Sequence, residues 1–387
     1  MIICEPIVWG EEHAPFNAGL VQVGVEASPD TVTFWGEVDH IAALRRIMPP
    51  AAAAQVDFAA RKPPARVQSA NSRVRHDAAH AWRAVRAAAD LGERHLIFAS
   101  AAPGTLIGAK VAGFTLGHRR PATFHVLHSP LTQVWGWRSR NPARRLVDIT
   151  GALSWPATRD VRLVILEAGI ADALATKIPA LASQILLLEH PIAETIEAPA
   201  TRRPGPVRLG FLGMASRAKG FDRYCALATM ARQRGATAEF HAIGMAEPGR
   251  EAQANMADLA SKPVSAKLQR AEFIERLRDL DMVVMTHDPA HYTYSPSGVL
   301  LDALAAGKPL LSLSNPLVDA IAERHGPIGP TVADLDDAVQ LIGDLTPEVL
   351  TRPPYTDYRT NLGNAAASRR PAALSAVLAR ALRDGST

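Results

Sequence analysis

The segment LGFLGMASRAKGFDRY, residues 209–224, decides the fold of the second half of this 387-residue chain. A short apolar run leads into a turn at Gly213, and an amphipathic stretch follows from 221 to 233. This pattern predicts a buried strand, a tight turn and a helix, which together open a βα unit. The turn and the start of the helix also carry Arg217, Lys219 and Gly220. The glycines do not form a dinucleotide fingerprint, and no P-loop pattern occurs in the chain.

The same alternation of short apolar runs and longer amphipathic runs extends along the chain and predicts parallel sheets covered by helices. In the first half we expect strands at 2–8, 31–35, 95–99, 123–128, 163–167 and 185–188, and helices at 16–26, 76–91 and 105–116. In the second half we expect strands at 207–213, 238–244, 281–286 and 309–313, and helices at 221–233, 272–278, 298–306, 316–324 and 334–342.

The run EAPATRRPGP at 197–206 is rich in proline, lacks periodicity and is the best linker candidate. We therefore expect an N-terminal domain over 1–196, a C-terminal domain over 207–352, and a tail over 353–387 whose helix can pack back on the first domain. The predicted fold class is α/β, with two facing, Rossmann-like, doubly wound domains. Ligands of such sheets bind at the carboxyl ends of the strands, so the active-site cleft is expected between the domains.

The composition, with 48% hydrophobic and 21% charged residues, is that of a soluble globular protein. No apolar run approaches the roughly 18–20 residues of a membrane span. The opening MIICEPIVWGEEH is interrupted by Glu5 and Pro6 and lacks a basic start, so it predicts a buried strand and not a signal peptide. Cys4 and Cys225 are expected to be buried free thiols in different domains, and a cytoplasmic location follows.

The formal net charge of +4 is unevenly distributed. Eight basic residues and no acidic residue occur between Arg94 and Val147, and five more basic residues occur between Arg61 and Arg75. Such a field favours phosphates, acidic glycans or peripheral contact with an anionic membrane surface, and the alternative is a solvated arginine-rich face. Nucleic acid is not expected as a partner, because aromatic residues make up only 5% and no recognised motif accompanies the charge.

The segment TYSPSGVLLDALAAGKPLL, residues 293–311, carries the second chemical signal. Ser295, Ser297 and Gly298 stand just before an apolar helix, whose free backbone N–H groups and dipole favour an anion. Asp302 lies about one turn into that helix, where its carboxylate can accept hydrogen bonds from a pair of ribose hydroxyls. The alternative is an ordinary capped helix. The preceding Lys219 loop makes a nucleotide site the better interpretation, since a lysine at a strand–helix junction suits a diphosphate.

In their order and spacing the two segments resemble the donor-binding signatures of GT-B glycosyltransferases, especially the large retaining group that includes sucrose and mannosyl transferases (family 4-like). That group carries G-R-x-x-x-x-K-G in the loop and E-x7-E in the donor helix. Lys219-Gly220 matches the K-G, and Asp302 occupies the second glutamate position. The family arginine falls at Met214, so that Arg217 is the alternative, and the first glutamate falls at Tyr294. Further matches on the donor helix are Ala303, Ala305, Gly307 and Pro309.

The resemblance implies transfer of a sugar from a nucleoside-diphosphate-sugar donor to a glycan, a lipid-linked saccharide or a small-molecule hydroxyl, in polysaccharide or glycoconjugate biosynthesis. No cofactor and no metal are expected. The candidate donor-binding residues are Gly213, Arg217, Lys219, Gly220, His287, Tyr294, Ser295, Ser297, Gly298 and Asp302. A metal held by His287, Asp288 and His291 is the less favoured alternative, because helix termini and basic side chains can stabilise the leaving diphosphate. A non-catalytic relative and a sugar-nucleotide epimerase are the rival functions.

The catalytic candidates Glu12, His13 and His128 lie in the first half. Glu12 and His13 follow the first strand, in a loop where acceptor contacts are expected, and either can act as a base or cap the helix. His125 and His128 are three apart on one strand, so they face opposite sides of the sheet. His128 lies at the carboxyl end. In retaining members a histidine near the end of a comparable strand contacts the donor sugar, so His128 is preferred over His13.

Overall fold

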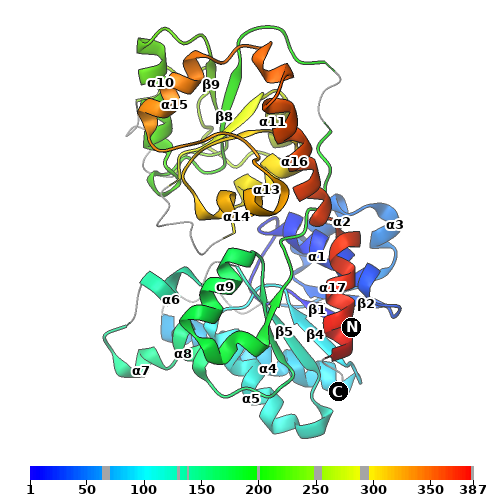
Figure 1. Ribbon diagram of the computed structural model, residues 1–387. Helices are drawn as coiled ribbons and strands as arrows, with labels where there is room; N and C mark the ends of the chain where they lie inside the picture. Colours follow the sequence, from blue (N-terminus) through cyan, green and yellow to red (C-terminus); the bar gives the residue numbers. More distant parts are fainter. Residues whose placement is uncertain are drawn as a thin grey trace. The chain divides into compact units, whose positions relative to one another are not determined.

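The computed structural model describes residues 1–62, 70–128, 131–136, 139–197, 201–247, 255–287 and 296–384. The chain divides into two compact units (Figure 1). The first unit comprises Met1–Glu194 and the C-terminal segment from Ser368, and the second comprises most of the chain from Thr195 to Ala367. Each unit is built around one sheet of parallel strands covered by helices, which confirms the predicted α/β class.

The first unit contains a sheet of seven parallel strands in the order β3-β2-β1-β4-β5-β6-β7. The strands are β1 (Ile2–Cys4), β2 (Val32–Gly36), β3 (Val56–Ala60), β4 (His95–Phe98), β5 (Ala122–Leu127), β6 (Val161–Ile165) and β7 (Ile185–Leu187). Since β1 pairs with both β2 and β4, the strand order reverses direction beside it. The carboxyl end of β1 is therefore a topological switch point, where open α/β sheets bind ligands.

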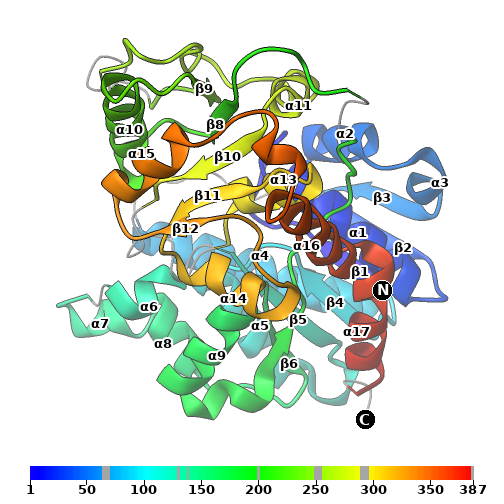
Figure 2. The ribbon, with the colours of Figure 1, turned by 45° about the horizontal axis from the view of Figure 1, so that its top comes forward.

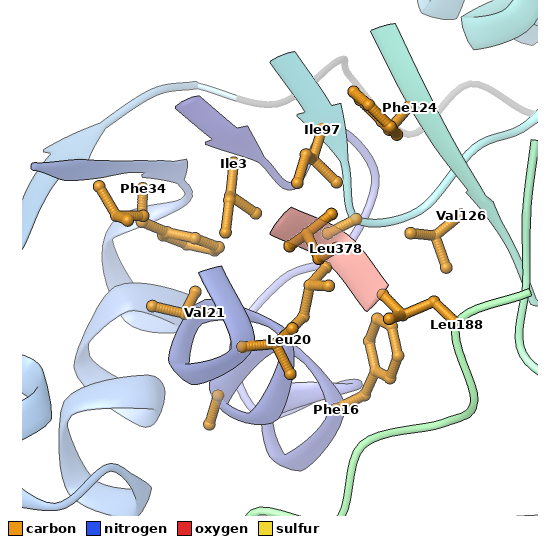
Figure 3. Packing of buried hydrophobic residues seen from close by; sticks show 14 of the residues in the cluster. Ile3, Phe16, Leu20, Val21, Phe34, Ile97, Phe124, Val126, Leu188 and Leu378 are labelled. Carbon is orange, nitrogen blue, oxygen red and sulfur yellow. The ribbon is translucent and has the colours of Figure 1, made fainter. Parts of the chain in front are cut away.

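Helices cover both faces of this sheet. On one face lie α1 (Ala14–Ala27), α2 (Val38–Ile47) and the C-terminal α17 (Pro371–Asp384). Figure 3 shows Leu20 of α1 and Leu378 of α17 packed towards Ile3 and Ile97 of the sheet. On the other face lie α4 (Ala70–Asp90) and α5 (Pro103–Leu116). The remaining helical segments are α3 (Pro50–Ala53), η1 (Gly117–Arg119), α6 (Thr132–Gly136), α7 (Pro142–Arg145), α8 (Ile149–Ser154), α9 (Ala168–Lys177) and η2 (Pro179–Gln184).

A buried ion pair ties the C-terminal segment to the first unit. Arg369 is 1% exposed, and its two terminal nitrogens donate to both carboxylate oxygens of Glu167 at 2.9 and 2.8 Å. Glu189 lies 3.3 Å from the same guanidinium. This bidentate geometry satisfies charges that would otherwise be costly to bury. Nearby, the N–H of Ile192, in the segment after β7, donates to the carbonyl of Arg369 at 2.9 Å, just before the start of α17.

Two glycines of α5 bring that helix unusually close to α4. A Cβ atom on Gly108 would lie 2.1 Å from the carbonyl oxygen of Ala78, and one on Gly104 would lie 2.7 Å from Cβ of Asp77. These positions tolerate only hydrogen at Cα, because the neighbouring atoms are backbone or the first side-chain carbon. The close contact fixes where the first turns of α4 lie relative to the sheet.

The second unit contains five parallel strands in the order β12-β11-β10-β8-β9, which Figure 2 shows side by side. They are β8 (Arg208–Leu212), β9 (Glu239–Ile243), β10 (Met282–Met285), β11 (Leu310–Leu313) and β12 (Thr331–Val332). The helices are η3 (Arg217–Lys219), α10 (Phe221–Gln233), α11 (Arg270–Arg278), α13 (Gly298–Ala305), α14 (Pro316–His325), α15 (Leu335–Gly343), η4 (Val349–Thr351) and α16 (Tyr355–Ser368). The order reverses between β8 and β10, which gives the second switch point.

The secondary-structure predictions hold for the central elements and fail at the margins. The first strand ends at Cys4 and not at Val8, because the buried Glu5 carboxylate accepts hydrogen bonds from the N–H groups of Ile7 and Val8 and turns the chain. The sequence prediction missed the edge strand β3, which is partly exposed and carries a polar Asp57. It also missed α2 and α16. Cys4 and Cys225 are buried and free, as predicted.

Within the described residues, no helix has the length and apolar character that crossing a bilayer requires.

Gly108→Ala tests the close contact of α4 and α5. The added methyl group meets the Ala78 carbonyl, so we expect a loss of roughly 1–3 kcal/mol in the free energy of unfolding. Gly363→Ala is the matched control, because Gly363 is also helical but has no atom within 4 Å of the place that a Cβ atom would take. The control should gain up to about 1 kcal/mol from helix propensity. Urea unfolding followed by circular dichroism measures both, and equal changes in the two variants would contradict the packing described.

Candidate functional site

The switch point of the second unit holds a lysine above a glycine turn. Gly213 follows β8 with φ of 88°, a left-handed conformation that favours glycine. A Cβ atom there would lie 3.3 Å from Nζ of Lys219 and 3.7 Å from the side chain of Val299. The ammonium group of Lys219 therefore lies over the turn, beside the first residues of α13.

The loop that carries Lys219 is fixed to the neighbouring strand. Gly220 has φ of 73°, and a Cβ atom on it would lie 1.9 Å from the carbonyl oxygen of Thr286, just after β10. The Thr286 hydroxyl donates to the carbonyl of Gly220 at 2.8 Å. Ser216 caps η3 by accepting from the N–H of Lys219. Glycine is thus required at 220 because the backbone of the Lys219 loop lies against the backbone of Thr286. This close approach positions Lys219.

Asp302 lies in α13 between two basic side chains. Its Oδ1 is 2.8 Å from Nη1 of Arg270, the first residue of α11. Burial lowers the pKa of Lys219, and the negative charge of Asp302 opposes that shift. The carboxylate of Asp302 thus interacts with both cations. Arg270 was not among the predicted residues, since an arginine starting a charged helix carries no distinctive sequence signal.

The start of α13 is a capped helix terminus beside Lys219. Ser297 is buried and its hydroxyl accepts from the N–H of Leu300 at 3.4 Å, so it caps the helix. Among the described residues, no atom lies within 4 Å of a Cβ position on Gly298. The predicted Tyr294 and Ser295 lie outside the described residues.

The other predicted donor-binding residues differ in how exposed they are. His287 follows β10 and is buried, 3% exposed. Arg217 is exposed on η3, so the second basic group beside the Lys219–Asp302 pair is Arg270. Of the suggested metal ligands, Asp288 and His291 lie outside the described residues, and the described part of the chain contains no cluster of three potential ligands.

The switch point of the first unit opens into a pocket of about 490 Å³. It lies at the carboxyl ends of β1, β4 and β5, and its size is within the range of small-molecule sites, about 300–1,000 Å³. Its apolar lining is Ile7, Val8, Val74, Ala101, Ala102, Pro103 and Val147. Its polar lining is Glu12, His13, Arg73, Asp77, Ser100, His128, Gln133, Arg144 and Asp148. All three predicted catalytic residues therefore line one cavity, which we call the β1 pocket.

His13 has a strained backbone at the edge of this pocket. With φ of 53° it is the one non-glycine residue at positive φ in the described part of the chain, and it precedes α1 without capping it through its side chain. Such strain costs of order 1–3 kcal/mol and persists where the surroundings enforce it. The imidazole is exposed, and its ring centroid lies 4.9 Å from that of His128.

Hydrogen bonds to two carboxylates hold the loop that carries His13. Glu5 accepts from the N–H groups of Ile7 and Val8 and from the side chains of Asn17 and Ser100. Glu37 accepts from the N–H of Gly10. The Nδ1–H of His40 donates to the carbonyl of Gly10 at 2.6 Å, and Nε2 then accepts from the Asn17 amide at 2.8 Å. This network fixes both the loop and the imidazole tautomer of His40.

His128 is held as a neutral imidazole. Its Nε2–H donates to the carbonyl of Ala99 at 3.1 Å, and its ring packs edge-on against Phe16 at 4.2 Å. Burial, together with the neighbouring His13 and His190, keeps the pKa of His128 well below its usual range. Burial also lowers the pKa of His190 to about 3. His125 faces the other side of the sheet and stacks on Phe98, as the strand spacing predicts.

Asp77 on α4 is the unexpected member of the pocket lining. It is 8% exposed, and it forms no hydrogen bond or ion pair with the described residues. Burial raises the pKa of its carboxyl group to about 6, against the opposing charges of Arg73 and His76. No sequence signal indicates this role, because Asp77 stands within an ordinary amphipathic helix.

Part of the basic charge noted in the sequence is satisfied locally. Lys110 is buried and its Nζ donates to the carbonyls of Ala152, Leu153 and Trp155, so it caps the end of α8. Arg119 pairs with Asp90 at 3.1 Å, and Arg120 pairs with Asp160. The positive field of this region is therefore weaker than the count of basic residues suggests.

Asp77→Asn tests the uncompensated carboxylate. The folded-state pKa lies above the unfolded one, so the group favours folding below about pH 4 and that advantage is lost as pH rises through about 6. The variant should therefore gain on the order of 1 kcal/mol relative to the parent at pH 7.5, about 2–4 °C in Tm, and little at pH 4. Asp172→Asn, an exposed change in the same unit, is the control. An equal difference at both pH values would contradict the prediction.

Neither a protein-family model nor a curated protein matches the sequence. Solved structures do match. HepE from Anabaena, crystallised with UDP and glucose, is similar with a TM-score of 0.64 and 13% identity over 99% of this chain and 100% of that chain. Sucrose-phosphate synthase from Thermosynechococcus elongatus is similar with a TM-score of 0.63 and 13% identity, over 99% of this chain and 98% of that chain. Arabidopsis thaliana UGT89C1, complexed with UDP-L-rhamnose, is similar with a TM-score of 0.55 and 12% identity, over 100% of this chain and 98% of that chain. At these identities the likeness concerns architecture, and the chain has the GT-B fold.

Proposed function

We propose that this chain is a glycosyltransferase that moves a sugar from a nucleoside-diphosphate donor to an acceptor hydroxyl. One observation carries the proposal: Lys219, the N-terminus of α13 and Asp302 meet at the switch point between β8 and β10. These three features suit a diphosphate and a ribose, and all belong to a single unit. The GT-B fold supports the proposal, because HepE and UGT89C1 have the same architecture and were crystallised with UDP and UDP-L-rhamnose.

The diphosphate is assigned to Lys219 and the first turn of α13. The ammonium group is largely buried beside Gly213, so its charge acts where water screens it less. The missing side chains of Gly213 and Gly298 let a phosphate approach closely, and the backbone N–H groups of the first turn of α13 can donate to its oxygens. Together these groups stabilise the negative charge that develops on the leaving nucleoside diphosphate. Neither a metal ion nor a cofactor is part of this proposal.

The ribose is assigned to Asp302. Oδ1 of Asp302 lies 2.8 Å from the guanidinium of Arg270, and a carboxylate can accept hydrogen bonds from ribose hydroxyls as well as from a guanidinium. The guanidinium thus orients the carboxylate. This arrangement differs from the family pattern, in which an arginine precedes the lysine in the first loop at the position of Met214.

The acceptor is assigned to the β1 pocket of the first unit. His13 is exposed at its edge and is the candidate base for the acceptor hydroxyl, with Glu12 as the alternative. His128 is half-buried and its pKa lies well below the usual range, so it suits a hydrogen bond to a sugar better than removal of a proton. A glycan, a lipid-linked saccharide and a small molecule remain the acceptor classes, in polysaccharide or glycoconjugate biosynthesis, with a cytoplasmic location and peripheral membrane contact as part of the proposal.

A second candidate is a non-catalytic protein that binds nucleotide sugar. Met214 and Tyr294, which stand where the retaining group has its arginine and first glutamate, favour it. Purified protein that binds a nucleotide sugar tightly without transferring or hydrolysing it would support this candidate. Turnover of the donor would exclude it.

Lys219→Ala tests the nucleotide site. We expect loss of measurable binding of nucleoside diphosphate by calorimetry against UDP, GDP and ADP, because the diphosphate loses its point charge. The melting temperature should change little, since burial of this ammonium group does not stabilise the fold. Lys267→Ala, an exposed change in the same unit, is the control. Unchanged nucleotide affinity in a folded Lys219→Ala variant would overturn the assignment.

A double-mutant cycle on Arg270 and Asp302 tests whether the arginine acts through the carboxylate. If it does, Arg270→Ala and Asp302→Ala each weaken nucleotide binding by roughly 10-fold, and the double variant is no worse than Asp302→Ala. The loss on Arg270→Ala should also be equal for a nucleoside monophosphate and diphosphate. A loss that grows with the number of phosphates would instead place the guanidinium on the diphosphate.

A further inference from the structure

We infer that the β1 pocket binds an uncharged, polyhydroxylated ligand of the saccharide class, whose hydroxyl groups donate to the carboxylates of Asp77 and Asp148. That this ligand is the acceptor of the transfer rests on the proposed function. The binding site itself follows from the lining residues of the first unit.

Asp77 is the first reason. Its carboxyl group is 8% exposed, lines the cavity and forms no hydrogen bond or ion pair with the described residues. Buried carboxylates in folded proteins are normally hydrogen-bonded, so one that faces a cavity without a partner points to a donor supplied by a ligand. The position of Asp77 is also fixed by packing against Gly104 of α5. A Cβ atom on Gly104 would lie 2.7 Å from Cβ of Asp77, so a larger residue at 104 would displace the aspartate.

Asp148 is the second reason. Its Oδ1 caps α8 by accepting from the N–H of Gly151 at 2.8 Å. Its Oδ2 is buried and has no hydrogen-bond partner within the described part of the chain. The residue is therefore fixed by the cap while its second oxygen remains unsatisfied. Two such carboxylates in one cavity, on α4 and at the start of α8, can hold hydroxyl groups at two places on a ligand.

The charges of the lining exclude a strongly anionic ligand. Within the described lining, three carboxylates (Glu12, Asp77, Asp148) face two guanidinium groups (Arg73, Arg144), and the half-buried His128 is neutral. The arginines are exposed while Asp77 is buried, so the interior of the pocket is the acidic part. A phosphate or carboxylate entering it would meet like charge, whereas hydroxyl groups meet acceptors.

The apolar part of the lining gives no particular support to a planar aromatic acceptor. Among the described residues, the lining contains no phenylalanine, tyrosine or tryptophan, and its apolar members are small or aliphatic. A planar aromatic acceptor would therefore find no phenyl, phenol or indole ring to stack on, and recognition depends mainly on the polar lining residues. The Gln133 amide and the Ser100 hydroxyl, which already donates to Glu5, offer further acceptors.

Two isosteric variants test the inference. Asp77→Asn replaces one oxygen by an amide nitrogen, and Asp148→Asn retains the Oδ1 that caps α8 while it replaces the unsatisfied Oδ2. The probes are the methyl glycosides of glucose, galactose, mannose and N-acetylglucosamine, together with maltose, titrated by ligand-observed NMR. We expect at least one probe to bind the full-length parent protein, and each variant to weaken it by roughly 10- to 100-fold. Asp172→Asn is the control and should bind like the parent.

A readout beyond binding separates a ligand contact from a structural role. Asp77→Asn should lose glycoside affinity while its melting temperature at pH 7.5 rises, and its affinity for nucleoside diphosphate should stay unchanged. Equal glycoside binding by parent and both variants would overturn the inference. So would failure of every glycoside to bind a protein that binds nucleotide. A parent protein that binds glycosides but no nucleotide would instead refute the proposed function and leave the pocket assignment standing.

Discussion

The parallel pairing of the strands is the constraint on which both candidate sites depend. In each unit all the paired strands run in the same direction, so their carboxyl ends and the loops that follow gather at one edge of the sheet. The reversal of strand order beside β1, and again beside β8, separates two of those loops and leaves room between them. Gly213 and the Lys219 loop occupy one such place, and the β1 pocket occupies the other.

The buried charged groups of the first unit differ in whether they have partners within the protein. The guanidinium of Arg369 is paired with the carboxylate of Glu167. The ammonium group of Lys110 donates to three carbonyls at the end of α8, and the carboxylate of Glu5 accepts hydrogen bonds from four donors. Each of these groups has its partners within the protein and fixes an element. Asp77 and Oδ2 of Asp148 have no such partner in the described residues. Both carboxylates line the same cavity, which is why we assign a ligand to the β1 pocket.

The sequence also indicated which residue types meet at the second site. The order of the glycine turn, Lys219 and the small-residue start of α13 predicted an anion site, and the structure brings these elements together beside β8. Arg270 was beyond prediction, because its contact with Asp302 joins two helices whose separation in sequence carries no periodicity. The roles of Tyr294 and Ser295 stay predictions.

By itself the sequence determined the alternation of strands and helices, the two-unit α/β class and the chemical character of the Lys219 loop, because these depend on local patterns of apolar residues, glycine and charge. Only the tertiary structure decided that Glu12, His13 and His128 line one pocket, and that Asp77 from a distant helix joins them. It also decided that the last helix belongs to the first unit, through Arg369 and Glu167. These contacts are made between segments remote in sequence, and side-chain burial and hydrogen bonding, which select them, exist only in the folded chain.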